Sequence, residues 1–208
     1  VKIGFFGIAT PETRYKSSPK NTKDVEFVDY IEASKKQVEE LKKQGAAIII
    51  AITHLGIDES SDERSDILAK EVKGIDLIID GHSHTRLEEG IKQGDTLIAQ
   101  TGEYLKNIGV VELKIKDGKL ESSKAHLVNF DEAKEIKADE KILDLIKKAN
   151  EANKSMLDKM VGYTNTELVG VRERVRTGET NLGNLVTDSM RKSISADVAI
   201  TNGGGIRA

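Results

Sequence analysis

Three of the four histidines in this chain follow directly after apolar segments. Residues 47–56 read AIIIAITHLG and residues 76–85 read DLIIDGHSHT, which places His54, His82 and His84 behind two apolar runs. Continuous apolar runs of this length predict buried strands of a sheet that is covered on both faces. Ligands of open α/β sheets bind at the carboxyl ends of such strands, and neutral imidazole is a common metal ligand. We therefore interpret the three histidines as ligands of one metal ion or of two adjacent ions.

The residues beside these histidines favour a metal site. Gly56 and Gly81 allow the backbone to turn sharply and to approach an ion closely. An extended backbone would direct the rings of His82 and His84 to the same side, because side chains of an extended chain repeat every two residues. His126 falls in a predicted antiparallel strand and is expected to be structural or exposed. A lone histidine at a strand end is usually a surface group, but three in matching positions favour metal binding.

No nearby acid completes a catalytic set in the sequence. Asp58, Glu59 and Asp62 follow the first histidine, but acids at a helix start more often pair with the helix dipole. Asp80 precedes His82 and His84 and is expected to turn the chain. A mononuclear site with three histidines, as in zinc hydrolases, is chemically complete and stays open as an alternative.

The elements that must position these histidines alternate between strands and helices in the first part of the chain. Apolar runs and helical spacing predict strands at 1–8, 46–53 and 75–80, with helices at 25–44 and 61–74. This order implies an α/β layered sheet. Short strands with glycine turns follow within 90–128, and Lys116 to Lys119 give a hairpin signal.

The second part of the chain begins after a polar stretch. The spacing predicts a charged amphipathic helix at 139–160, a strand at 161–170, a helix at 179–195 with an inward apolar face, a strand at 196–201 and a glycine loop at the end. We divide the chain into one domain over 1–130, a linker and helix over 131–160, and the start of a second domain over 161–208.

Composition excludes several classes of protein. The 208 residues include 35 acids and 32 bases, for a net charge of -3, which argues against binding to a nucleic-acid duplex. The absence of cysteine excludes disulfides, a thiolate nucleophile and a zinc–sulfur site. No run of eighteen apolar residues is present, so no membrane-spanning helix is expected in this segment.

Five motifs together resemble a known family. ITHLG, DLIIDGHSHT and QTGEYLKNIGVVEL resemble the second half of a calcineurin-like metallophosphoesterase domain, and RTGETNLGNLVTDSMR and ADVAITNGGGIRA resemble the opening of a 5′-nucleotidase C-terminal domain. The family includes 5′-nucleotidases, UDP-sugar hydrolases and 2′,3′-cyclic-nucleotide 2′-phosphodiesterases. The resemblance implies an α/β fold: the second half of an αββα sandwich, followed by the start of the C-terminal domain.

The resemblance also implies a chemistry. It assigns His54 and His82 to one divalent metal ion and His84 to a second, and it assigns Arg207 of the NGGGIR motif to substrate phosphate. Manganese, zinc, iron, magnesium and calcium are not distinguished by these ligands. The implied partner is a nucleotide or a nucleotide-like phosphoester, and the implied location of the parent protein is periplasmic, secreted or on the cell wall.

Several family motifs are missing from this chain. Asp-x-His, Gly-Asp and Gly-Asn-His motifs are not found at the expected places, so the catalytic histidine is expected upstream of residue 1. We therefore expect a piece truncated at both ends, inactive or nearly so alone, with open sheet edges available for self-association. The alternatives are a non-catalytic scaffold that binds metal or nucleotide, and the mononuclear zinc hydrolase.

Overall fold

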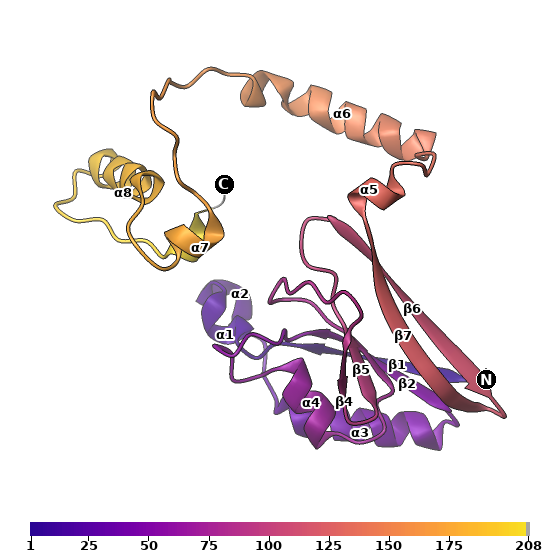
Figure 1. Cartoon of the computed structure of the whole chain (residues 1–208). Helices are drawn as coiled ribbons and strands as arrows, with labels where there is room; N and C mark the ends of the chain where they lie inside the picture. Colours follow the sequence, from indigo (N-terminus) through magenta and orange to yellow (C-terminus); the bar gives the residue numbers. More distant parts are fainter. Residues whose placement is uncertain (207–208) are drawn as a thin grey trace. The chain divides into compact units, whose positions relative to one another are not determined.

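The computed structural model describes residues 1–206 and divides them into two compact units that meet between Ala138 and Asp139. Arg207 therefore lies outside the described residues. Figure 1 labels the helices and strands of each unit.

The first unit is built on a five-stranded sheet. Its strands are β1 (Ile3–Ala9), β2 (Ile48–His54), β3 (Leu77–Ile79), β4 (Ile91–Gln93) and β5 (Thr96–Ala99), in the order β1-β2-β3-β5-β4. The first, second, third and fifth strands run parallel, and β4 is antiparallel to β5. The strands predicted at the three long apolar runs are confirmed, and the carboxyl ends of β2 and β3 lie side by side.

Alternate residues of β2 face two different layers. Ile49 and Ala51 pack with helix residues in one apolar cluster, whereas Ile48 and Ile50 pack against a hairpin in another. Burial on both faces explains why this strand reads as a continuous apolar run. Double burial holds for the first four residues of β2, whereas Ile52, near the end that carries His54, is exposed.

Helices cover one face of the sheet (Figure 1). They are α3 (Tyr30–Lys43) and α4 (Ser65–Glu71), both shorter than the sequence predicts. The first begins at Tyr30 rather than at residue 25 because the side chain of Asp29 caps it, accepting a hydrogen bond from the amide of Glu32 at 2.8 Å. Between β1 and α3 the chain also forms two one-turn helices, α1 (Thr13–Lys16) and α2 (Pro19–Thr22).

A long hairpin lies against the other face of the sheet. Its strands, β6 (Asn107–Lys116) and β7 (Lys119–Asn129), are joined by Asp117 and Gly118, both with positive φ, as a tight type I′ turn requires. The predicted hairpin is confirmed. A one-turn helix, α5 (Phe130–Ala133), follows and closes the unit with the segment to residue 138.

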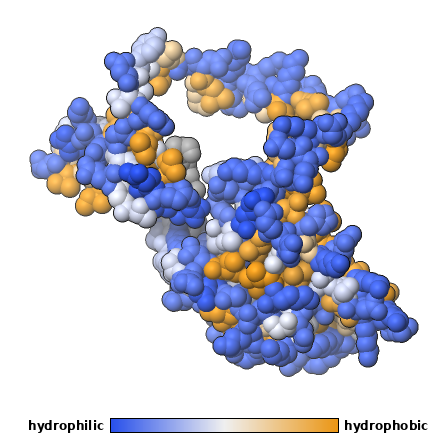
Figure 2. Space-filling model, in the orientation of Figure 1, coloured by the Kyte–Doolittle hydropathy of each residue, from blue (hydrophilic) through white to orange (hydrophobic). Residues whose placement is uncertain are grey.

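The hairpin leaves part of its face of the sheet exposed. Ile3, Phe5, Ile52 and Ile79 share this face by their strand register and are between 38% and 55% exposed. Figure 2 shows apolar surface gathered over the sheet of this unit.

The second unit consists of helices and irregular segments. It contains α6 (Glu140–Leu157), α7 (Arg172–Val175), α8 (Asn181–Ser193) and a short 3-10 turn η1 (Gly203–Gly205). The two long helices are confirmed, with side-chain caps from Asp139 and Thr180. The strands predicted at 161–170 and 196–201 are wrong: among the described residues both segments are irregular and pair with no other strand.

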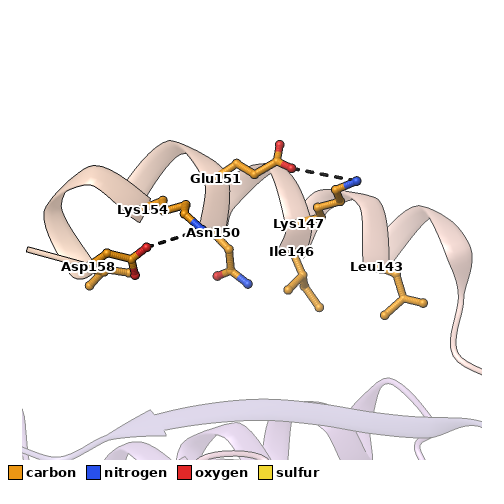
Figure 3. A pocket seen from close by; sticks show the side chains of 8 residues that line it. Leu143, Ile146, Lys147, Asn150, Glu151, Lys154 and Asp158 are labelled. Atoms are coloured by element: carbon orange, nitrogen blue, oxygen red, sulfur yellow. Dashed lines mark ion pairs between the residues drawn. The ribbon is translucent and has the colours of Figure 1, made fainter.

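The apolar faces of α6 and α8 are exposed in this unit. Neither helix buries a single residue, so the inward apolar face predicted for the helix at 179–195 is also wrong within the described chain. Figure 3 shows Leu143 and Ile146 leaving the same side of α6, where they line a shallow hollow with polar neighbours. Among the described residues, no helix has both the length and the apolar content to cross a membrane.

Candidate metal centre

His54 is the last residue of β2, and the loop that follows it is held tightly. The carbonyl oxygen of His54 accepts a hydrogen bond from the amide of Thr10 at 3.1 Å. Gly56 has a φ of 78°, and a Cβ built there would lie 2.8 Å from that of Ser83. Glycine is therefore required at position 56, since it lets the loops after β2 and β3 approach each other.

The backbone of the GHSH segment is not extended, contrary to the sequence expectation. His82 and His84 have φ values of 74° and 57°, in the left-handed region. Such values are uncommon for residues other than glycine and cluster at functional sites. The two rings consequently contact different partners rather than lining up side by side.

His54 and His82 meet at the edge of the sheet. Nε2 of His54 lies 3.1 Å from Nδ1 of His82, and the ring centroids are 4.8 Å apart with planes inclined at 63°. Two nitrogens bound to one cation at about 2.1 Å would lie roughly 3.0 to 3.4 Å apart in octahedral or tetrahedral geometry. This nitrogen pair therefore fits two positions around one cation.

Glu12 contacts the ring nitrogen of His82 that does not face His54. Its Oε2 lies 3.1 Å from Nε2 of His82, and its side chain is only 3% exposed. The same carboxylate accepts hydrogen bonds from Lys16 Nζ at 2.5 Å and from the Tyr15 hydroxyl at 3.1 Å. Burial alone would raise the pKa of Glu12, but the hydrogen bonds from Lys16, His82 and Tyr15 outweigh it and hold the pKa below its ordinary value. The carboxylate is thus charged at neutral pH.

His84 has a carboxylate of its own. Its Nδ1 lies 2.8 Å from Oε2 of Glu103, and its ring meets that of Tyr104 edge-on at 6.4 Å between centroids. Burial raises the pKa of Glu103, but hydrogen bonds from Lys106 and His84 bring it below the ordinary value.

Asp80 joins the two histidine loops. Its Oδ1 accepts hydrogen bonds from the Thr53 hydroxyl at 2.7 Å and from the amides of Leu55 and Gly56 at 3.1 Å. Its Oδ2 accepts one from Gln100 Nε2 at 3.3 Å. The expectation that Asp80 only turns the chain misses this role, because a single acid before a glycine carries no signal of its distant partners.

Buried Gln100 extends the same network into the GHSH segment. Its side-chain oxygen accepts hydrogen bonds from the amide of Thr85 at 2.6 Å and from the Ser83 hydroxyl at 3.1 Å. The amide of Ile57 in turn donates to Ser83 at 3.2 Å. Every one of these contacts fixes one histidine loop against the other or against β5.

Burial lowers the pKa of His54 below its ordinary value. The imidazoles of His82 and His84 lower it further, and the carboxylate of Asp80 acts in the opposite direction. A lowered pKa keeps the ring neutral at physiological pH, which is the form that binds cations.

The donor set is therefore suited to a cation but incomplete by itself. Within residues 1–206, no group of three or more histidine, cysteine or carboxylate side chains is arranged to hold a metal ion. The pair of His54 and His82 fits one cation, while His84 faces Glu103. Sequence reasoning found all three histidines, and it missed Glu12 and Glu103 because isolated acids give no pattern.

The glycine loop of the second unit packs against α7. A Cβ on Gly203 would collide with the backbone carbonyl of Val175, and one on Gly204 would lie 3.4 Å from Nη2 of Arg176. The side chain of Asn181 accepts a hydrogen bond from the amide of Val169 and donates one to a carbonyl oxygen in the same segment, both at 2.8 Å. The described part of the NGGG loop is therefore tightly seated beside a guanidinium group.

Comparisons with known proteins identify similar sequences and folds. Residues 160–208 match the family described as 5′-nucleotidase, C-terminal domain. Over 219 residues the chain is 38% identical to the trifunctional nucleotide phosphoesterase protein YfkN of Bacillus subtilis (strain 168), a match that covers 100% of this chain and 14% of that protein.

Two solved structures support the fold. The 5′-nucleotidase precursor from Thermus thermophilus is similar with a TM-score of 0.80 and 29% identity, over 99% of this chain and 43% of that one. The calcineurin-like phosphoesterase YfkN from Bacillus subtilis is similar in fold with a TM-score of 0.58 and 23% identity, over 76% of this chain and 53% of that one.

The predicted α/β class and the resemblance seen in the five motifs are confirmed by these likenesses. The chain spans 14% of YfkN and 43% of the Thermus protein. Residues 160–208 thus match the 5′-nucleotidase C-terminal domain family, and the whole chain is similar to nucleotide phosphoesterases and 5′-nucleotidases.

Proposed function

We propose that this chain is a segment of a metal-dependent hydrolase of nucleotide phosphoesters. The observation that supports this most strongly is the 3.1 Å separation between Nε2 of His54 and Nδ1 of His82 at the carboxyl edge of a parallel sheet. In this proposal His54 and His82 serve one divalent cation and His84 serves a second. The chemistry supplied at such a centre is Lewis-acid polarisation of a phosphoryl oxygen and activation of water.

The residues of this chain have defined tasks in the proposal. His54, with its lowered pKa, offers a neutral imidazole. Asp80 and Gln100 hold the two histidine loops in register. The imidazole donors suit zinc or iron better than calcium or magnesium, which prefer oxygen ligands.

The second unit is proposed to bind the substrate. Arg207, which lies outside the described residues, and Arg176, beside the glycine loop, carry the charge and the planar geometry that pair with phosphate. The substrate class is 5′-nucleotides, 2′,3′-cyclic nucleotides or both, in line with the name of the relative YfkN. Export of the parent protein is part of the same proposal, as is self-association through open sheet edges.

The full-length gene product that contains residues 1–208 provides the test. AMP and 2′,3′-cyclic AMP hydrolysis would be measured with Mn²⁺ or Zn²⁺, with and without a chelator. We expect His54→Ala and His82→Ala to lower kcat by at least about a hundredfold, because each removes a metal ligand, and His126→Ala to leave it unchanged.

The isolated 208-residue chain is expected to turn over these substrates at a small fraction of that rate. Full activity of the isolated chain would contradict its proposed status as an incomplete segment. Binding of metal and nucleotide by the full-length protein, without hydrolysis of either ester, would favour the non-catalytic scaffold. One tight ion per full-length protein would favour the mononuclear zinc hydrolase.

A further inference from the structure

Glu12 is a buried carboxylate that belongs to none of the sequence motifs. It lies in the segment after β1, seventy positions before His82 in the chain, yet its Oε2 reaches Nε2 of that ring at 3.1 Å. Lys16 donates to the same oxygen, and the Tyr15 hydroxyl donates to Oε1. Three donors therefore fix a group that is 3% exposed, and one of the three is a histidine of the proposed metal centre.

The contact determines which nitrogen of His82 carries the proton. An ionised carboxylate has no hydrogen to donate, so the ring nitrogen that faces it must be the N–H. Nε2 of His82 is therefore protonated, and Nδ1 of the neutral ring keeps its lone pair. That lone pair is the one directed toward His54, 3.1 Å away.

His84 provides an internal contrast. Its carboxylate partner, Glu103, faces Nδ1 rather than Nε2, at 2.8 Å. The same reasoning gives His84 the opposite tautomer, with the proton on Nδ1. Two histidines separated by one residue thus have their tautomers set by two different acids from two different parts of the chain.

We propose that Glu12 is a positioning residue that holds His82 as the Nε2–H tautomer and aims its Nδ1 at the position shared with His54. The use of that Nδ1 as a metal donor rests on the proposed function. Carboxylates behind metal-binding histidines act in this way, and their loss typically weakens metal affinity about 10- to 100-fold.

The tautomer can be measured without any metal. Two-bond ¹H–¹⁵N spectra of the ¹⁵N-labelled chain, at about pH 8 and thus above the ordinary imidazole pKa of ~6.5, distinguish protonated from unprotonated ring nitrogens. We expect His82 as Nε2–H and His84 as Nδ1–H. The opposite tautomer at His82 in the unsubstituted chain would overturn the proposal, and this result needs no variant to fold.

Matched variants separate positioning from packing. Glu12→Leu keeps the buried volume but removes the acceptor, and we expect the Nδ1–H form of His82 to become populated. Glu12→Gln keeps an acceptor oxygen and should retain most of the original tautomer. Lys16→Met removes another partner of the same carboxylate and should leave the tautomer unchanged. An unchanged His82 tautomer in folded Glu12→Leu would contradict the proposal.

A second acid serves as the reciprocal control. Glu103→Leu should change the tautomer of His84 and leave that of His82 as it is. A change at His82 in this variant, as large as that in Glu12→Leu, would show general disruption of the site and would overturn the specific role of Glu12.

Zinc affinity then tests the link to the proposed function. We expect Glu12→Leu to weaken Zn²⁺ binding about 10- to 100-fold, and Lys16→Met to have little effect. If the tautomers behave as described but Zn²⁺ binds equally well to His54→Ala, the proposed metal centre fails while the role of Glu12 in fixing the ring stands.

Discussion

The two units of this chain use similar amphipathic helices in opposite ways. In the first unit α3 packs Val38 against the sheet, where it is only 3% exposed, whereas in the second unit Ile146 of α6 is 51% exposed. Among the described residues, every buried apolar side chain except Val175 belongs to the first unit. Helical periodicity in a sequence therefore shows that a face can be buried, but not that this chain supplies what buries it.

Amide hydrogen exchange should give the largest contrast between the units. Amides of β2, β3 and β5 lie in a buried sheet, whereas α6 buries no residue. Opening free energies follow buried contacts, so we expect exchange from α6 to be faster by roughly a thousandfold or more. Equal protection of the sheet and of α6 in the monomeric chain would contradict the difference between the two units.

Two matched substitutions of isoleucine by alanine should show the same contrast in unfolding free energy. Ile78 is fully buried at the centre of the sheet, so Ile78→Ala should cost about 4 kcal/mol of unfolding free energy in denaturant titration. Ile146→Ala removes the same atoms from the exposed face of α6 and should cost less than about 0.5 kcal/mol. Similar losses for the two variants would show that α6 is covered in solution.

Removal of the Asp80 carboxylate should cause the next largest loss of unfolding free energy. Asp80→Ala leaves the amides of Leu55 and Gly56 without their acceptor and removes one of two partners of the Thr53 hydroxyl. Unsatisfied buried donors are costly, and we expect a loss of about 3 kcal/mol in the first unit. Asp62→Ala, at an exposed acid in the same region, is the control and should have almost no effect.

Removal of a helix cap should give the smallest and most local change. The Asp139 side chain accepts hydrogen bonds from the amides of Lys141 and Ile142 at 2.9 and 3.1 Å. Asp139→Ala should destabilise α6 by about 1 kcal/mol, visible as lower helical circular dichroism. The unfolding midpoint of the first unit should not move, because both capped amides belong to the second unit. A shift there would contradict the local role of this cap.

The sequence was a good guide to elements that the chain completes by itself. The apolar runs of β1, β2 and β3 and the Asp117–Gly118 turn could be predicted because their partners lie in the same unit. The segments at 161–170 and 196–201 were also predicted as strands, but they find no strand partner in the described chain. Strand formation depends on a neighbour, which local sequence cannot reveal.

The candidate site was likewise predictable only in part. His54, His82 and His84 follow from their place after apolar runs, and the structure brings the first two within 3.1 Å. Glu12, Asp80 and Glu103 act across long sequence separations, so their roles emerge only from the fold. The left-handed backbone of the GHSH segment was missed because non-glycine residues rarely adopt it.

The central claim is that His54 and His82 offer two nitrogens to one divalent cation. Titration of the ¹⁵N-labelled chain with Zn²⁺, followed at the imidazole nitrogens, tests it directly. We predict that Nε2 of His54 and Nδ1 of His82 shift together along one saturable curve, and that His54→Ala abolishes the shift at His82. Zinc binding that leaves both nitrogens unchanged, or that survives in His54→Ala with the His82 shift intact, would contradict the account.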